Sequence, residues 1–143
     1  MGLKLALMYP TRLEAYFSYM TGKISENHEA LLSLKLFGLA KRSIKIIASI
    51  DTGFNGFLTL PVAEITKLKL PMVGKRKGKL ADGSLKEFSI FSVLVEWLGE
   101  KKQVLVFEAE GGPLVGMAML EGNRLIMDVE VGGTVEIKNL NNQ

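Results

Sequence analysis

Ile46–Gly56 reads IIASIDTGFNG, an apolar run that leads to a single acid and is followed by a turn-forming sequence. The apolar and small residues up to Ile50 predict a buried strand. Asp51 stands at the end of that strand, where burying a charge is costly unless the charge is shared or hydrogen-bonded. Gly53 permits a close approach of other backbone that a Cβ would block. The stretch therefore predicts an acid held on a tight loop with another part of the structure pressed against it.

The composition is typical of one globular domain. The 143 residues are 48% hydrophobic and contain no cysteine, which excludes disulfides and thiolate metal sites. No apolar run reaches the roughly 18 residues of a membrane span, and residues 3–9 are too short for a signal core. The net charge of +3 is too small to indicate nucleic acid by itself. We therefore expect a soluble, cytoplasmic protein that does not associate with a membrane.

The chain is expected to divide into an N-terminal extension, residues 1–19, and one domain, residues 20–143. In the extension, Leu13, Tyr16 and Phe17 fall at helical spacing. A segment lying on the domain surface is favoured over a membrane-surface helix, because the basic polar face that such a helix needs is missing.

Short strand patterns separated by turn signals fill the domain. Alternating leucines in residues 32–36 and the apolar residues 44–50 predict a hairpin that delivers Asp51, and Pro61 is expected to be the first residue of a short helix. Further strands are predicted at residues 57–60, 75–80, 85–91, 88–97, 104–109, 114–115, 125–131 and 134–137, those at 75–80 and 85–91 flanking the Asp82-Gly83 turn. Many short strands with little helix favour an all-β fold, a closed barrel with one or two short helices.

Two polar features allow more than one interpretation. Residues 74–79 read GKRKGK, a basic loop between glycines; contact with nucleic acid is one interpretation, and a solvated strand end is favoured. His28 is the single histidine and has Glu26 and Glu29 beside it. A metal site is conceivable there, but an exposed turn residue is favoured because one imidazole cannot make a usual zinc site.

These pieces, in this order, resemble the retropepsin-like aspartic proteases, the family of retroviral proteases and their cellular relatives. Residues 48–53 (ASIDTG) resemble the catalytic motif, and residues 58–61 (LTLP) continue it as in the cellular branch. Residues 80–84 (LADGS) resemble the flap hairpin, with the Asp-Gly pair typical of a tight turn. Residues 114–116 (LVG) resemble the family's motif of two hydrophobic residues and a glycine before a short helix. The resemblance covers about residues 22–138.

The sequence departs from the family pattern at two places. Phe54-Asn55 replaces the commoner alanine-containing continuation, and residues 117–119 read MAM where many relatives carry an acidic residue. Neither departure touches Asp51.

The resemblance implies an acid-protease-like barrel with one lobe per chain and the function of an aspartic endopeptidase. Asp51 would be the catalytic residue, with Thr52 and Gly53 supporting its loop. The flap would supply the substrate-binding residues Ala81, Asp82, Gly83 and Ser84. The motif that supports the catalytic loop would be Leu114, Val115 and Gly116. No metal and no cofactor is implied.

The chemistry of this family needs two carboxylates that share one proton, yet the chain has one Asp-Thr-Gly. Asp82 belongs to a hairpin turn, and Asp128 is expected to point outward from a late strand. The second carboxylate is therefore expected from another copy of the chain, in a homodimer that acts on a peptide or protein substrate.

Two other functions remain open. The first is a non-catalytic dimeric module of the same fold that binds extended peptides. The second is a basic nucleic-acid-binding β-domain centred on Lys75, Arg76, Lys77 and Lys79. The lack of an aromatic residue within that basic run counts against the second function, because bases stack on aromatic side chains.

Overall fold

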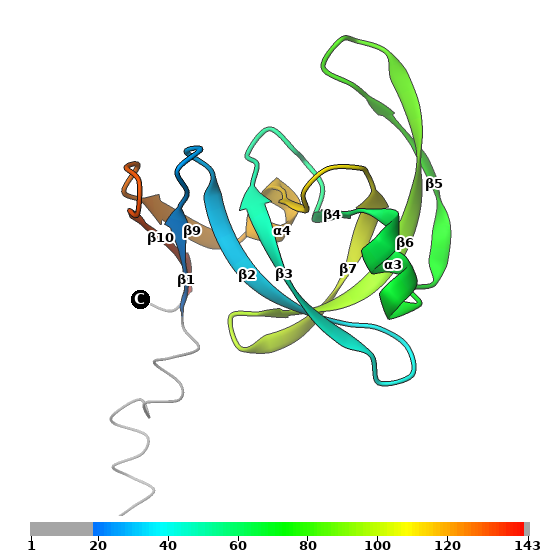
Figure 1. Ribbon diagram of the computed structural model, residues 1–143, viewed down its shortest axis with the longest axis horizontal. Coiled ribbons are helices and arrows are strands. Elements are labelled where there is room, and N and C mark those ends of the chain that lie inside the picture. The colour runs from blue at the N-terminus through cyan, green and yellow to red at the C-terminus, as the bar shows by residue number, and fades with distance from the viewer. Residues whose placement is uncertain (1–18, 142–143) are drawn as a thin grey trace, which may run out of the picture.

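The computed structural model describes residues 19–141, and the helical spacing predicted for Leu13, Tyr16 and Phe17 lies outside them. Within residues 19–141, ten strands form one sheet and two short helices accompany it (Figure 1). The strands of the first half are β1 (Tyr19–Ile24), β2 (Ala30–Phe37), β3 (Ser43–Ile50), β4 (Leu58–Leu60) and β5 (Met72–Lys79). Those of the second half are β6 (Leu85–Trp97), β7 (Glu100–Glu108), β8 (Leu114–Val115), β9 (Asn123–Met127) and β10 (Thr134–Asn139). The all-β prediction, with one lobe per chain, is confirmed.

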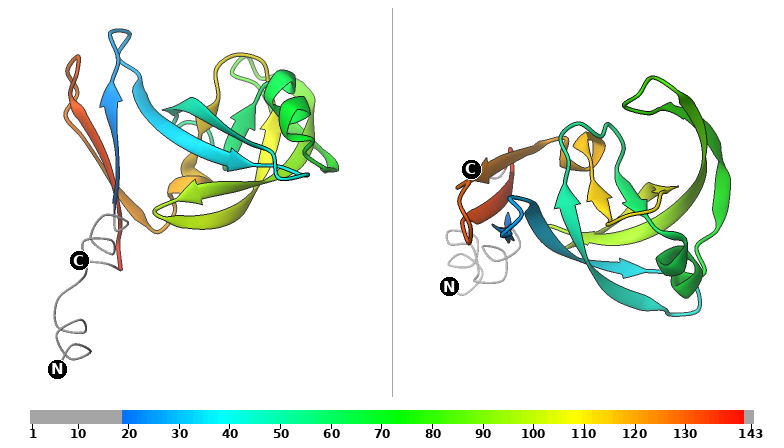
Figure 2. Two further views of the ribbon diagram at one scale, coloured as in Figure 1. Left: turned by 60° about the horizontal axis from the view of Figure 1, so that its bottom comes forward. Right: turned by 45° about the horizontal axis from the view of Figure 1, so that its top comes forward.

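The order of the strands is β5-β6-β7-β4-β8-β3-β2-β1-β10-β9, and β2 also pairs with β6. That last pairing joins Leu36 to Val95 and Phe37 to Leu94. Strands β6, β7, β4, β8, β3 and β2 therefore form a closed circuit, in which each strand pairs with the next and β2 pairs back with β6. Strands β1, β10 and β9 leave this circuit as a separate three-stranded ribbon (Figure 2). Among residues 19–141, no helix is long and apolar enough to cross a membrane.

Strand β2 supplies much of the core. Its residues Ala30, Leu32, Leu34 and Leu36 are buried at the spacing of two that places side chains on one face of a strand. Each fully buried leucine contributes about 1.5–3 kcal/mol relative to an exposed one. Strand β3 pairs with β2 from Leu31↔Ser49 to Phe37↔Ser43, so the predicted hairpin that delivers Asp51 is present.

The helix α3 (Val62–Leu68) follows β4, one residue later than predicted. Pro61 is the N-cap rather than the first helical residue, because its backbone (φ −71°, ψ 159°) still has the extended conformation of the strand before it. Ile65 and Leu68 are buried beneath the helix. The second helix, α4 (Met117–Leu120), is a single turn that starts after Gly116.

The basic run of residues 74–79 lies within β5, so its description as a loop is wrong. Strand β5 pairs antiparallel with β6 from Met72↔Phe91 to Lys79↔Leu85, which confirms the strands predicted at residues 75–80 and 85–91 on either side of the Asp82-Gly83 turn. The β5–β6 hairpin extends beyond the body of the molecule and curves over it (Figure 1). Asp128 likewise lies past the end of β9, in the exposed turn before β10, and not on a late strand.

Candidate functional site

Asp51 lies directly after β3, where the backbone turns out of the sheet. Its N–H donates a hydrogen bond to Val115 O (2.9 Å) in β8, and its carbonyl oxygen accepts one from the N–H of Phe54 (3.1 Å). The half-buried Asp51 side chain accepts a hydrogen bond at Oδ1 from the N–H of Gly53 (2.9 Å). A Cβ at Gly53 would come within 3.2 Å of that oxygen, which is tighter than ordinary contact. The backbone of the turn therefore holds the Asp51 carboxylate in place.

The loop after Asp51 is attached to the start of α4 by three backbone hydrogen bonds. Gly116 N–H donates to Phe57 O (3.0 Å), Met117 N–H to Phe54 O (2.8 Å) and Ala118 N–H to Gly56 O (3.1 Å). Gly116 is required for this approach, because a Cβ there would overlap the carbonyl oxygen of Gly56. The backbone of helix α4 thus closes one side of the Asp51 loop.

Strand β8 lies between the strand that enters the loop and the strand that leaves it. It pairs parallel with β3 (Ser49↔Leu114, Ile50↔Val115) and antiparallel with β4 (Leu58↔Val115). Thr59, buried in β4, accepts a hydrogen bond at Oγ1 from the N–H of Leu114 (2.9 Å). The structure therefore brings the predicted residues Leu114, Val115 and Gly116 against Asp51 and the loop that follows it.

The turn Ala81–Ser84 is at the exposed tip of the β5–β6 hairpin. Leu80 N–H donates to Ser84 O (2.8 Å), and Gly83, with φ +86°, donates to Leu80 O (2.9 Å). Asp82 Oδ1 accepts hydrogen bonds from Ser84 Oγ (2.6 Å) and from Ser84 N–H (2.9 Å). These bonds, the hydroxyl first, hold the pKa of Asp82 below its ordinary value of 3.8. The carboxylate of Asp82 is therefore engaged within its own turn.

A groove of about 450 Å³ separates the Asp51 loop from the β5–β6 hairpin. Gly53, Phe54 and Asn55 line it on the loop side, and Arg76, Gly78, Lys79 and Phe88 line it on the hairpin side. Its aromatic side chains pack together: Phe107 makes an edge contact with Phe54 (5.8 Å between centroids) and a stacked contact with Phe88 (6.0 Å). The predicted flap residues Ala81–Ser84 are not among the residues that line the groove; the hairpin's arms are.

Asp51 itself does not line this groove but a second cavity, of about 340 Å³. It is lined by Asp51 and Thr52, by His28 and Glu29 from the β1–β2 turn, and by Met127 and Val129 near the end of β9. His28 is an exposed turn residue with φ +61°, as predicted. In the part of the chain that the structure describes, no three His, Cys, Asp or Glu side chains are grouped so that they could hold a metal ion.

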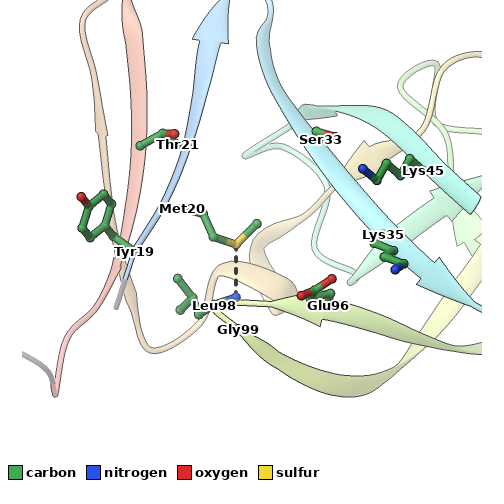
Figure 3. Close-up of a pocket in the computed structure, with 9 residues that line it drawn as sticks. All are labelled: Tyr19, Met20, Thr21, Ser33, Lys35, Lys45, Glu96, Leu98 and Gly99. Carbon is green, nitrogen blue, oxygen red and sulfur yellow. Dashed lines mark hydrogen bonds between the residues drawn. The ribbon is translucent and has the colours of Figure 1, made fainter. Parts of the chain in front are cut away.

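Another cavity, of about 630 Å³, lies apart from the predicted site residues, none of which lines it. Figure 3 shows the Met20 side chain reaching from β1 to the backbone of Leu98, whose N–H donates to the sulfur (3.3 Å). Lys35, Lys45 and Glu96 line the opposite side of this cavity. It shares no residue with the groove beside Asp51.

Of the residues that form the groove, the sequence predicted Gly53 as part of the site but did not place the others there. Phe88 and Phe107 were predicted as strand residues, and Arg76 and Lys79 as part of a basic strand that could contact nucleic acid. The alternation of glycine with charge in residues 74–79 was the available signal, since it marks a strand face with little side-chain bulk. Which face would point toward Asp51 depends on pairing with β6, and that is not visible in the run itself.

The fold is similar to that of a retropepsin-like aspartic protease from Rickettsia conorii, with a TM-score of 0.55 and 15% sequence identity over 85% of this chain and 90% of that chain. The protease of Simian foamy virus (mac) also matches, with a TM-score of 0.46 and 15% identity over 63% of this chain and 90% of that chain. No protein-family model matches the chain, and no curated protein is similar to it in sequence. The similarity to the Rickettsia conorii protease shows that this chain has a retropepsin-like fold.

Proposed function

We propose that the protein is an aspartic endopeptidase that is active as a homodimer, with one Asp51 from each chain. The observation that carries this proposal is the Asp51 carboxylate, held by the Gly53 N–H at 2.9 Å on a loop that borders a groove. The hairpin of β5 and β6 forms the far wall of that groove. The fold shared with the Rickettsia conorii protease supports the same function.

A single chain supplies half of the proposed site. Asp82 is engaged by Ser84, and Asp128 lies in the exposed turn before β10. A second Asp51 from a two-fold related copy would complete the pair, because an isologous contact brings the same residue of both chains to the axis. Thr52 and Gly53 are exposed beside Asp51, where the partner's loop would approach.

Apolar surface next to Asp51 fits the same arrangement. Met127 and Val129 line the cavity beside Asp51 and remain 38% and 68% exposed. A second copy that reaches Asp51 would cover both side chains and remove apolar area from water, which favours association.

The two carboxylates would share one proton, because two like charges in contact do not both ionise easily. The ionised carboxylate removes a proton from a water molecule, and the oxygen of that water attacks the peptide carbonyl carbon. The protonated carboxylate gives its proton to the carbonyl oxygen, which yields a neutral tetrahedral diol. Transfer of a proton to the amide nitrogen then releases the amine and leaves a carboxylic acid.

Cleavage of an apolar-rich peptide library by wild type, Asp51→Asn and Glu100→Gln tests the proposal. Asp51→Asn keeps the size of the side chain but cannot act as a base, so we expect kcat/KM to fall by about 10³-fold or more. Glu100→Gln, the same change of carboxylate to amide at the exposed first residue of β7, is expected to retain wild-type activity. Equal activity in all three proteins would show that Asp51 is only a turn residue. Binding of the peptides by wild type without cleavage would favour the non-catalytic peptide-binding module instead.

A further inference from the structure

We propose that Arg76 and Lys79 make the groove selective for a peptide with an Asp or Glu side chain close to the bond that is cut. The acidic side chain would meet the two cations on the hairpin, and a neighbouring apolar side chain of the same peptide would lie on Phe54, Phe88 and Phe107. This inference rests on the proposed peptidase function and adds a substrate class to it.

The register of β5 and β6 decides which cations face the groove. Arg76 is directly opposite Phe88, which lines the groove, and residues opposite each other in an antiparallel pair share a face of the sheet. Gly74 and Gly78 lie two residues to either side of Arg76, so they occupy the same face and carry no side chain. Arg76 is therefore the one side chain that this face of β5 presents between the two glycines.

Lys75 and Lys77 alternate with Arg76 along β5 and do not line the groove, and Lys75 forms an ion pair with Glu87 on the neighbouring strand (3.7 Å). Lys79 alternates with Arg76 as well, but it is the last residue of β5, next to the turn, and lines the groove from there. The basic run is thus divided between two faces of the hairpin, instead of forming one continuous track for a phosphate backbone. This division favours a peptide over a nucleic acid as the partner of Arg76.

The groove contains positive charge without a balancing acid. None of the described residues that line it is an Asp or Glu, and the two ion pairs found in residues 19–141 involve neither Arg76 nor Lys79. Lys86, two residues before Phe88, places its Nζ 5.5 Å from the centroid of the Phe88 ring and adds to the positive potential. A guanidinium with free N–H donors binds a carboxylate in bidentate geometry, so Arg76 supplies the stronger of the two contacts.

The aromatic floor connects this charge to the reacting centre. Phe54 follows Asp51 by three residues in its loop and contacts Phe107, which stacks on Phe88. Gly78 lies so close to this floor that a Cβ there would come within 2.7 Å of the Phe88 ring. A peptide that crosses the floor therefore passes from the Asp51 loop to Arg76 within one groove, and this sets the acidic residue near the cleaved bond.

The test compares peptides in which Glu replaces Gln, one position at a time, around the site of cleavage. We expect wild type to cleave at least one Glu peptide with kcat/KM about tenfold above that of the matching Gln peptide. This is the effect expected of one charge-assisted hydrogen bond at a partly solvated site. Arg76→Gln should abolish that preference, so that the Glu and Gln peptides are cleaved with about equal kcat/KM. Lys77→Gln, which removes the neighbouring charge on the opposite face, should retain it. Arg76→Glu should transfer the preference to a peptide with Lys at the same position.

Failure of the inference is distinguishable from failure of the proposed function. If wild type cuts Glu and Gln peptides equally at every position, the acidic subsite is excluded while the peptidase stands. If wild type cuts neither the Glu nor the Gln peptides, the peptidase proposal fails. Binding of the same peptides, labelled and measured by fluorescence anisotropy, then tests the acidic subsite independently of cleavage. Tighter binding of a Glu peptide that is lost in Arg76→Gln supports it. Equal binding of both peptides, or Arg76-dependent binding of an oligothymidylate tighter than of any peptide, overturns it.

Discussion

Gly116 shows how one missing side chain sets the position of the proposed catalytic acid. It packs against the loop that follows Asp51, with the carbonyl oxygens of Gly56 and Phe54 directly over the position of a Cβ. Its own N–H donates to Phe57 O at 3.0 Å. Any side chain at Gly116 would push the loop outward and lengthen these hydrogen bonds.

We therefore expect Gly116→Ala to lower the free energy of unfolding by about 1–3 kcal/mol, the usual cost of overpacking a well-filled site. It should also reduce peptide cleavage, because the Asp51 loop is displaced. Gly112→Ala is the matched control, since nothing lies within 4 Å of a Cβ built at Gly112. Urea unfolding of both variants checks the prediction. Equal stability of the two would contradict the close packing at Gly116.

At the scale of elements, the β5–β6 hairpin depends on its turn. The Asp82 side chain accepts two hydrogen bonds from Ser84, and this lowers the pKa of its carboxyl. A depressed pKa means that the ionised form stabilises the folded turn. This contribution is present above the ordinary value of 3.8 and is lost as the pH falls through the lower folded value.

Ser84→Ala removes the largest cause of the lowered pKa, the hydroxyl bond, and should raise the pKa of Asp82 toward its ordinary value. The amide of residue 84, which donates to Asp82, should exchange faster with solvent once the carboxyl is protonated at low pH. An NMR titration of the Asp82 carboxyl in both proteins measures the shift. An unchanged titration curve in Ser84→Ala would show that the hydroxyl bond does not set the pKa.

Gly83 tests whether the turn acts on substrate. Its φ of +86° is strained for any residue with a Cβ, most of all a β-branched one. We expect Gly83→Val to reduce kcat/KM by about tenfold through misplacement of the hairpin, and to change the melting temperature little because the turn is exposed. Ala81→Val places the same valine side chain where φ is not positive and serves as the control. Full activity in Gly83→Val would exclude a role for this turn in turnover.

The elements near Asp51 could be predicted because their signals are local. The alternating burial of β2, the apolar β3 and the Asp82-Gly83 turn are each written within a few residues. The strands on either side of that turn could be predicted for the same reason, but which side chains of β5 share a face with Phe88 depends on the register of its pairing with β6. The groove also depends on long-range pairing: Phe54, Phe88 and Phe107 come from separate segments, and only the sheet brings them together.

At the scale of the whole molecule, the sheet order determines where the parts of the site meet. The closed circuit from β6 round to β2 holds β8 between β3 and β4, which fixes the Asp51 loop from both sides. The three-stranded ribbon of β1, β10 and β9 stands outside this circuit, and its residues Met127 and Val129 reach the cavity beside Asp51. In the proposed dimer, the half-sites of two chains would meet through the surface around Met127 and Val129, which is exposed in a single chain.

The central claim is that each active site needs Asp51 from two chains, and a mixing experiment tests it most directly. Wild type and Asp51→Asn are combined in equal amounts, allowed to exchange subunits, and assayed for peptide cleavage at constant total protein. Random pairing leaves about one quarter of the dimers with two intact acids, so activity should fall to about one quarter of that of the same total amount of wild type. Mixing with Glu100→Gln in place of Asp51→Asn should leave activity unchanged. Activity at about one half in the Asp51→Asn mixture, as expected for chains that act independently, would contradict the shared site.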